Sequence, residues 1–331
     1  MRNFSTESGK LHKETAGVRK TFGKKECLHP EAPHNCRGKI VNAHTIQRSG
    51  GLTSIAEDGH VLTPDPYTDP TEFKKIGVRR ASTFSGFCKF HDDTLFAPIE
   101  KHDLRLNRRH AFLIAFRVVS HELYLKRRTV ELHIPEGAPF PDFMLSYQAG
   151  ARIAIRDLDR LHNDMGNALR NRRFRKTKFF AIEFDADPQV LCSGTPNVEF
   201  DFHGNHLQIL TRRKPLEYIT FSILPFNGNR SVAVFAWYEK SHVNASFIRS
   251  LSSLSKKQIP DAVVRFAFQH LENLFLAPTW WDRTPDTVKE LLLKRYDSTF
   301  WRDGKTLIDL RPDGVKLVDW KVTDFKTNLK L

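Results

Sequence analysis

The sequence predicts an α+β fold, in which a small N-terminal module held together by Cys and His side chains precedes a larger domain of helices and antiparallel strands. Three observations predict this. Cysteines and histidines cluster near the N-terminus, apolar residues then recur at helical spacing, and short strand-like runs follow between turn residues. The chain has 331 residues, which is enough for about two domains. Its hydrophobic fraction of 40% excludes a disordered protein.

Composition divides the chain into three regions. Residues 1–25 mix Gly, Ser, Thr and Lys with little apolar periodicity, and predict a flexible basic arm. Residues 26–103 hold three of the four cysteines and several loop stretches, so they need a cross-link or a metal to form a stable module. Residues 104–331 carry the regular patterns. They predict a basic α+β domain, and the sequence leaves open whether it serves recognition, oligomerisation or binding of a partner protein.

Two helices are expected to open the larger domain. Apolar residues recur at helical spacing from Ala111 to Leu125, flanked by arginines and lysines. Gly137 and the neighbouring prolines end this pattern. A second helix is predicted over 147–173, with apolar side chains on one face and arginines on the other.

Strand-like runs and further helices complete the predicted domain. The expected strands are 179–184, 198–202, 207–210, 218–224 and 231–238. Turn-prone residues separate them, and this spacing favours an antiparallel sheet. The remaining sequence predicts helices over 247–254, 260–276 and 285–295, and a short hairpin near Asp313-Gly314.

The charge balance favours a nucleic-acid partner. Lys plus Arg number 52 and Asp plus Glu number 38, which gives a net charge of +14. A polyanion that binds such a surface releases counterions. Basic clusters are expected to contact phosphates, although the charges near 170 also suit the end of a helix dipole. These candidate phosphate contacts are Arg170, Arg172, Arg173, Arg175, Lys176, Arg212 and Arg213. The alternative is a basic protein whose charge only keeps it in solution.

The sequence predicts a cytoplasmic protein without a membrane segment. No uncharged apolar stretch of 18 residues exists, and residues 1–25 lack the apolar run of a secretory signal. Four cysteines are too few for a disulfide scaffold. Glycine loops that cradle phosphates and Gly-x-Ser-x-Gly elbows are also missing, which excludes common NTPase and α/β-hydrolase sites.

Clustered Cys and His residues predict a structural zinc ion. Zinc in such sites takes four sulfur or nitrogen ligands in a tetrahedron. The candidate ligands are Cys27, Cys36, Cys88 and His91. The Cys88-x-x-His91 spacing lets both side chains turn toward one ion, whereas the Cys27/Cys36 pair is looser, and His29 or His34 could replace one cysteine. Four protein ligands leave no open position for catalysis.

A resemblance covers about residues 27–100. The segment Ala43-His44-Thr-Ile-Gln-Arg-Ser-Gly-Gly51, bracketed by the zinc ligands, resembles the treble-clef, ββα-metal core of HNH endonucleases. The resemblance implies that His44 is the general base, that Asp92 holds a catalytic Mg²⁺ or Mn²⁺, and that Arg48 contacts the strand to be cut. Ala43 and Gln47 depart from the family pattern, which usually has a metal-binding Asp or His and a Pro there.

Two functions therefore follow from the sequence. The first is a metal-dependent nuclease that hydrolyses phosphodiester bonds of DNA or RNA, similar in organisation to bacterial antiviral-defence and toxin effectors. The alternative is a non-catalytic zinc-containing protein that binds nucleic acid or another protein, in which His44 packs within the zinc loop. Arg105/His110 and Arg156/His162 are also similar to the Arg-x(4–6)-His signature of HEPN ribonucleases, a spacing that arises easily by chance.

Overall fold

A computed structural model describes residues 21, 23–65, 72–101, 103–134, 141–209, 214–300 and 309–330. Most of the predicted N-terminal arm lies outside these residues. The chain forms two compact units, each made of three segments. Unit 1 comprises Met1–Ala43, Phe84–Thr94 and Val119–Asn171, and unit 2 comprises His44–Thr83, Leu95–Val118 and Arg172–Leu331. The units thus interleave along the chain instead of dividing between residues 103 and 104.

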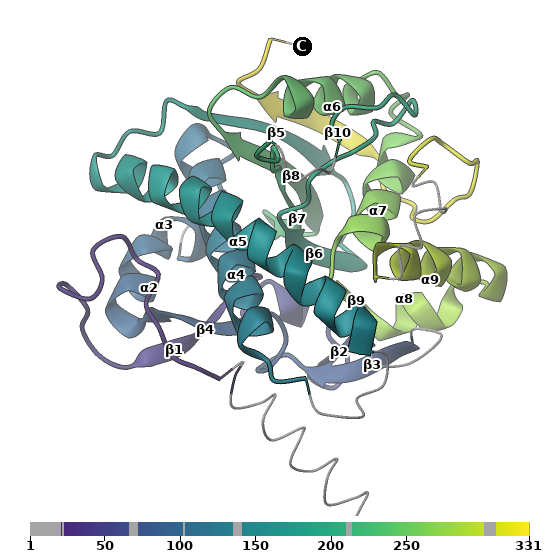
Figure 1. Cartoon of the computed structure of the whole chain (residues 1–331). Helices are drawn as coiled ribbons and strands as arrows, with labels where there is room; N and C mark the ends of the chain where they lie inside the picture. Colours follow the sequence, from purple (N-terminus) through teal and green to yellow (C-terminus); the bar gives the residue numbers. More distant parts are fainter. Residues whose placement is uncertain are drawn as a thin grey trace, which may run out of the picture. The chain divides into compact units, whose positions relative to one another are not determined.

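Unit 2 contains an eight-stranded sheet with the strand order β10-β5-β8-β7-β6-β9-β2-β3 (Figure 1). The strands are β2 (His60–Asp65), β3 (Glu72–Gly77), β5 (Thr177–Phe184), β6 (Val190–Gly194), β7 (Thr220–Phe226), β8 (Arg230–Tyr238), β9 (Leu274–Leu276) and β10 (Val322–Thr327). All neighbouring strands in this order are antiparallel. The predicted α+β class with an antiparallel sheet is confirmed.

Aromatic and β-branched residues explain the central strands. Phe221 of β7 and Phe235 of β8 are register partners, and their rings stack with centroids 4.3 Å apart. Such cross-strand pairs stabilise a sheet beyond their hydrogen bonds. Their face of the sheet packs against apolar residues of three helices (Figure 1). These helices are α6 (His242–Ser252), α7 (Ile259–His270) and α9 (Asp286–Phe300).

A second apolar cluster within unit 2 fixes the segment that follows β1 (Ile40–His44). Ile46, Leu52 and Ile55 are buried there against Leu191 of β6 and Phe275 of β9. The short helices η1 (Leu52–Ser54), α3 (Ala97–Glu100) and α8 (Pro278–Arg283) also belong to unit 2. The loop after His44 is therefore anchored on the sheet by burial of apolar side chains.

Unit 1 combines a strand pair with helices. β1 pairs with β4 (Thr83–Cys88), which leads directly into α2 (Lys89–Leu95). The long helix α4 (Arg108–Glu131) begins in unit 2, and its residues from Val119 onward belong to unit 1 together with α5 (Pro141–Arg170). The predicted pair of helices is confirmed, with α5 starting before residue 147 and ending before residue 173.

The strands predicted over 198–202 and 207–210 do not form in the described residues, so these two predictions are wrong. Only an isolated bridge joins Phe200 to His206. The Asp201 carboxylate accepts hydrogen bonds from the backbone N–H groups of His203 and Asn205, both at 2.8 Å. Gly204 has a φ of +82°, which suits glycine. This side-chain turn offers the backbone an alternative to a strand ladder.

The C-terminal third also departs from expectation. The predicted helix over 260–276 ends at His270, and Leu274–Leu276 instead pair with Val190–Cys192 as β9. No hairpin forms near Asp313-Gly314 in the described residues, where the Asp313 carboxylate instead accepts hydrogen bonds from the guanidinium groups of Arg265 and Arg295. Strands β2, β3, β6 and β10 were not predicted. At these short segments, pairing with other strands determines the secondary structure more than the local sequence pattern does.

None of the helices within the described ranges is both long enough and apolar enough to cross a membrane.

Candidate functional site

Three cysteines and one histidine of unit 1 come together as a group that could hold a metal ion. The sulfur atoms of Cys27, Cys36 and Cys88 and a ring nitrogen of His91 all lie within 4.8 Å of one another. The His91 Nδ1 atom is 3.4 Å from Cys27 Sγ, 3.8 Å from Cys36 Sγ and 3.3 Å from Cys88 Sγ. The structure therefore gathers all four predicted ligands.

These distances fit a tetrahedral site. Zinc–sulfur and zinc–nitrogen bonds of about 2.3 and 2.05 Å at tetrahedral angles place the sulfur and nitrogen atoms about 3.6 Å apart. The three observed separations lie on both sides of this value. Three thiolates and one imidazole are also a common donor set for structural zinc.

The junction between β4 and α2 positions half of the group. Cys88 is the last residue of β4, and His91 lies in the first turn of α2. The backbone N–H groups of Lys89 and Phe90 donate to the carbonyls of Lys39 and Arg37, at 2.8 and 3.3 Å. These bonds hold the start of α2 against the residues that follow Cys36.

The other half is held along β4. The backbone N–H groups of Glu26 and Leu28 donate to the carbonyls of Ser85 and Gly86, at 3.1 and 2.9 Å. Cys27 lies between them, and its sulfur accepts from the Cys88 N–H at 3.4 Å. Gly86 is required here, because a Cβ atom would come within 2.3 Å of the Phe84 ring.

Crowding of the sulfur atoms favours a bound cation. Burial and the neighbouring Cys27 and Cys88 sulfurs raise the pKa of the Cys36 thiol to about 12. Burial also raises the pKa of the Cys27 thiol. Burial acts in the same direction on Cys88, but hydrogen bonds from the backbone N–H groups of His91 and Arg37 and from the Cys36 and Cys27 side chains together outweigh it and lower the pKa of that thiol. Three thiolates at this spacing repel one another unless a metal ion compensates their charge.

His29 contacts the group by stacking. Its ring lies 3.7 Å from that of His91, centroid to centroid, at an interplanar angle of 10°. Its Nδ1 accepts a hydrogen bond from the Glu31 N–H. Burial, followed by the nearby His91 ring, lowers the pKa of His29 to about 4, so the ring is neutral at pH 7. His29, Glu31 and His91 also form a second group with ligand spacing, whereas His34 belongs to neither group among the described residues.

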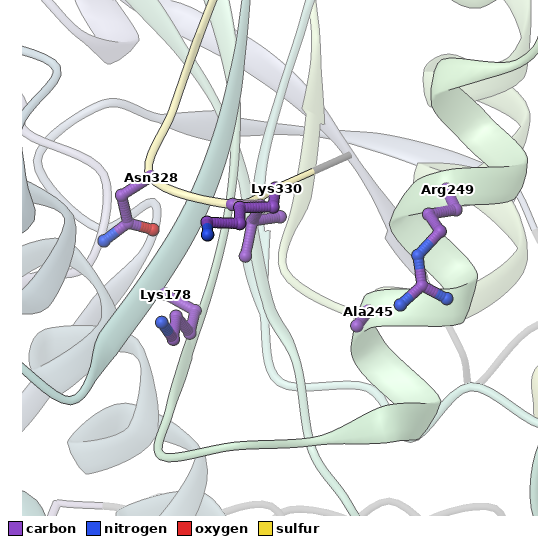
Figure 2. A pocket seen from close by; sticks show the side chains of 6 residues that line it. Lys178, Ala245, Arg249, Asn328 and Lys330 are labelled. Atoms are coloured by element: carbon purple, nitrogen blue, oxygen red, sulfur yellow. The ribbon is translucent and has the colours of Figure 1, made fainter.

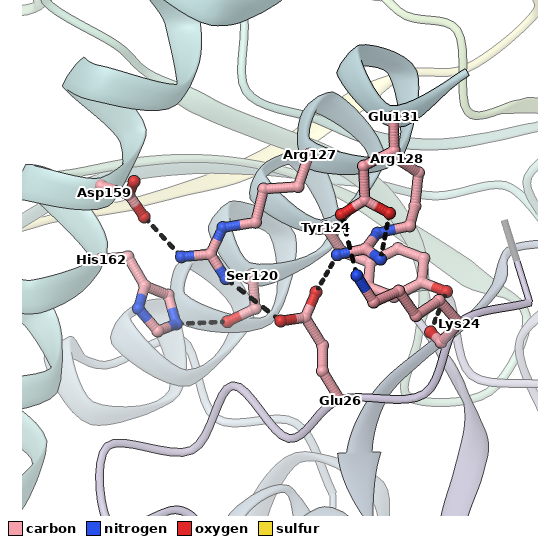
Figure 3. A network of polar contacts seen from close by, with 9 residues as sticks. All are labelled: Lys24, Glu26, Ser120, Tyr124, Arg127, Arg128, Glu131, Asp159 and His162. Carbon is pink, nitrogen blue, oxygen red and sulfur yellow. Dashed lines mark hydrogen bonds and ion pairs between the residues drawn. The ribbon is translucent and has the colours of Figure 1, made fainter. Parts of the chain in front are cut away.

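A polar network secures the segment that carries Cys27 (Figure 3). The Glu26 carboxylate accepts hydrogen bonds from Arg127 at 3.2 Å and from Arg128 at 2.9 Å. Arg127 also donates to Asp159 of α5 at 2.7 Å, and the Tyr124 hydroxyl donates to the Lys24 carbonyl at 2.8 Å. The residue before the first cysteine is thus tied to both long helices of unit 1. Glu26 could not be recognised from the sequence, because its partners Arg127 and Arg128 lie 101 and 102 residues away.

His44 lies at the end of β1 and is oriented by the backbone of Val78. The Val78 carbonyl accepts a hydrogen bond from the His44 ring, while Nε2 is buried without a partner among the described residues. Burial lowers the pKa of His44, and the charges of Arg48 and Arg117 lower it further. The ring is therefore neutral at pH 7, and its hydrogen bond to the carbonyl leaves the other nitrogen as the acceptor.

A cavity of about 490 Å³ adjoins the loop that follows His44, within unit 2. It is lined by Thr45, Gln47 and other residues of that loop, by Ile99, Glu100, Asp103 and Leu104, and by the turn between β7 and β8. Arg117, whose side chain is 4% exposed, also lines it and donates to Glu100 at 2.8 Å. Arg48, which is predicted to contact the nucleic-acid strand, is exposed in this loop.

The remaining predicted catalytic residue, Asp92, lies in the first turn of α2. It belongs to unit 1, whereas His44 belongs to unit 2. Neither residue is part of a three-ligand group within the described chain. Ala43, which stands where the resembled family has a metal ligand, is 1% exposed and offers no donor atom.

The predicted phosphate contacts have different surroundings. Arg170 donates to the Pro30 carbonyl at 2.7 Å, and therefore ties α5 to the cysteine loop. Lys176 forms an ion pair with Glu239. Arg172, Arg173 and Arg175 are exposed and form no ion pair with other described residues. Arg212 and Arg213 lie outside the described residues.

The two Arg/His pairs of HEPN-like spacing have local partners. The His110 ring accepts from the backbone N–H of Arg105 at 3.0 Å, near the start of α4. His162 Nε2 is 3.1 Å from the Ser120 hydroxyl, and the ring is 8% exposed, while Arg156 pairs with Asp157. These contacts give each histidine a structural role in its own unit.

Comparison with known proteins adds no family to this geometry. No family model, no curated protein and no solved structure matches the chain. The arrangement of its own residues therefore carries the functional argument.

Proposed function

We propose that unit 1 holds a structural zinc ion in a treble-clef, HNH-like module, and that the chain is a metal-dependent nuclease acting on DNA or RNA. The observation that supports this most directly is the set of sulfur–nitrogen distances around His91 Nδ1, which lie close to those of a tetrahedral zinc site. Further support comes from β4, which ends in the ligand Cys88, and from α2, whose first turn contains the next ligand, His91.

The proposed chemistry assigns roles to two side chains. His44 is neutral at pH 7 and donates to the Val78 carbonyl, so Nε2 is the nitrogen that accepts a proton from water. Asp92 would provide a carboxylate ligand for Mg²⁺ or Mn²⁺. When bound, such a cation stabilises the charge that develops on the phosphate and the leaving oxygen. Because Nε2 is covered in this structure, access for water requires movement of the surrounding side chains.

Cleavage assays with matched variants test this proposal. Purified protein is incubated with plasmid DNA and with single-stranded DNA and RNA oligonucleotides, in the presence of Mg²⁺ or Mn²⁺. We expect cutting that falls at least about a hundredfold in His44→Ala, because a general base contributes ~10²–10⁴-fold. His60→Ala is the matched control, since His60 is exposed and its ring contacts the Asp58 carbonyl. Equal activity in all three proteins would refute the role of His44.

A second candidate is a zinc-containing protein that binds nucleic acid without cutting it. It is favoured by the buried Ala43, which offers no metal ligand, and by the covered Nε2 of His44. This candidate predicts no cleavage with either metal. It also predicts nucleic-acid binding that weakens steeply as the salt concentration rises, because binding releases counterions.

A further inference from the structure

A second cavity, of about 300 Å³, lies at the opposite edge of the sheet of unit 2 from β3. It is bounded by the start of β5, by α6 and by the residues that follow β10 (Figure 2). The lining residues are Lys178, Ala245, Arg249, Asn328, Leu329 and Lys330. Three of the six side chains are cations and none is a carboxylate.

Hydrogen bonds to β5 place the C-terminal part of this lining. The Asn328 side chain accepts from the Phe179 N–H at 3.1 Å and donates to the Thr177 carbonyl at 2.9 Å. The Thr327 hydroxyl donates to the Phe179 carbonyl at 2.7 Å. These bonds lie on both sides of Lys178, and they hold Asn328 beside that lysine. Lys330, two residues further along the chain, also lines the cavity.

Helix α6 contributes the third cation. Arg249 lies on its exposed face, two turns after the N-terminal residue His242. Figure 2 shows its guanidinium beside the methyl group of Ala245, across the cavity from Lys178 and Lys330. The small Ala245 side chain leaves room in front of the guanidinium group.

The three cations of this cavity differ from their neighbours in being unpaired. Lys176 pairs with Glu239, and Lys326 pairs with Asp324. Among the residues that the structure describes, Lys178, Arg249 and Lys330 form no ion pair; Arg249 has only a 3.4 Å contact to the Ser246 hydroxyl. Three like charges around one cavity repel one another, and an anion between them would convert this repulsion into attraction.

We propose that this cavity binds a phosphate-type oxyanion. Two ammonium groups and one guanidinium offer many N–H donors, and tetrahedral oxyanions accept hydrogen bonds in several directions. The volume is at the lower end of the ~300–1,000 Å³ of small-molecule sites and leaves room for a phosphate group. The phosphate could be free or could belong to a nucleic-acid backbone. The site does not depend on cleavage at His44 or on zinc in unit 1.

A titration with inorganic phosphate tests the proposal in the full chain. Backbone amide NMR signals are followed at constant ionic strength. We expect saturable shifts at Lys178, Asn328 and Leu329. The double variant Lys178→Gln/Lys330→Gln should weaken this binding by roughly tenfold or more, because it removes two charge-assisted contacts.

Lys326→Gln is the matched control, because it removes an exposed but paired lysine from β10. It should leave phosphate affinity within about twofold of the original value, as expected for an exposed charge outside the site. Absence of saturable shifts in the unsubstituted protein would refute the site. Equal weakening in the control and the double variant would also refute it, because the effect would then follow net charge alone.

A short single-stranded oligonucleotide distinguishes the two sources of phosphate. If the double variant weakens binding of both phosphate and the oligonucleotide, the cavity receives a backbone phosphate. If it weakens binding of phosphate alone, the cavity receives a free phosphate group. Each of these results supports an oxyanion site, and neither requires that the protein cut nucleic acid.

Discussion

The Glu26 carboxylate accepts a 2.9 Å hydrogen bond from the guanidinium of Arg128, whose side chain is only 3% exposed. Glu26 immediately precedes Cys27, the first cysteine of the metal group. The charge of a buried arginine in α4 is therefore compensated partly by the segment that carries a candidate metal ligand. Packing of the helix and assembly of the metal group should be coupled through this contact.

Replacement of Glu26 by Gln should lower the free energy of unfolding by about 2–3 kcal/mol. The loss of one partner leaves a buried charge poorly compensated. Glu131 remains as a second partner of Arg128 at 2.9 Å and limits the effect. Urea unfolding followed by circular dichroism measures it. Lys89→Gln is a control, because the exposed Lys89–Asp93 pair should contribute little to stability.

Elemental analysis should find one zinc ion per chain, and Cys88→Ser should abolish it. Removal of a thiolate from a four-ligand site weakens metal binding strongly, and folding of the surrounding segment is coupled to that binding. Cys192→Ala is the matched control, because Cys192 is fully buried in the core of unit 2 and belongs to neither metal group. It should lose stability but keep its zinc. Zinc retained in Cys88→Ser would contradict the assignment of the ligands.

His29→Ala should keep the zinc ion but release it several-fold faster to a chelator. The His29 ring covers His91 by stacking, and its removal opens a path for solvent to a ligand. The measurement is the rate of zinc transfer to a coloured chelator. If His29→Ala instead purifies without zinc, His29 is itself a ligand.

Stability should fall between about pH 6.5 and pH 4 through His162. Burial lowers the pKa of this histidine to about 4 in the folded chain, whereas its ordinary value is 6.5. Between these values the unfolded chain binds a proton that the folded chain does not bind, so acidification favours unfolding. The contribution is present above pH 6.5 and is lost as the pH falls, by about 2 kcal/mol between pH 7 and 4.5.

The variant His162→Gln isolates this effect from acid release of the metal, which both proteins share. The free energy of unfolding is measured by urea titration at several pH values. The difference between the two proteins should change by about 2 kcal/mol over the same range. Parallel stability curves would mean that His162 does not titrate in this way.

Local sequence patterns were sufficient to predict an element or a site where the pattern is long or chemically specific. The apolar spacing around Ala111–Leu125 predicted α4, and the Cys and His residues predicted a group that could hold a metal ion, because paired Cys and His ligands at short spacing are typical of zinc sites. Strands 179–184 and 231–238 were also predicted, since aromatic and β-branched residues dominate both.

Features that depend on distant partners were not predictable. The apolar residues of β9 continue the pattern of α7, and only their pairing with β6 and β2 makes them a strand. The turn at Asp201 depends on one carboxylate that captures two backbone N–H groups. Glu26 looked like any acidic residue, because its importance comes from arginines in α4.

The interleaving of the two units affects biosynthesis. Unit 1 needs residues up to Asn171, yet residues 44–83, which the ribosome makes earlier, join a sheet whose other strands come from 177 onward. During translation β2 and β3 therefore stay unpaired with the rest of their sheet until β9 has been made, about two hundred residues after β3. A gene fragment that ends after His91, the last of the four candidate ligands, would lack segments that both units need in order to fold. We therefore expect recombination to transfer the two units together.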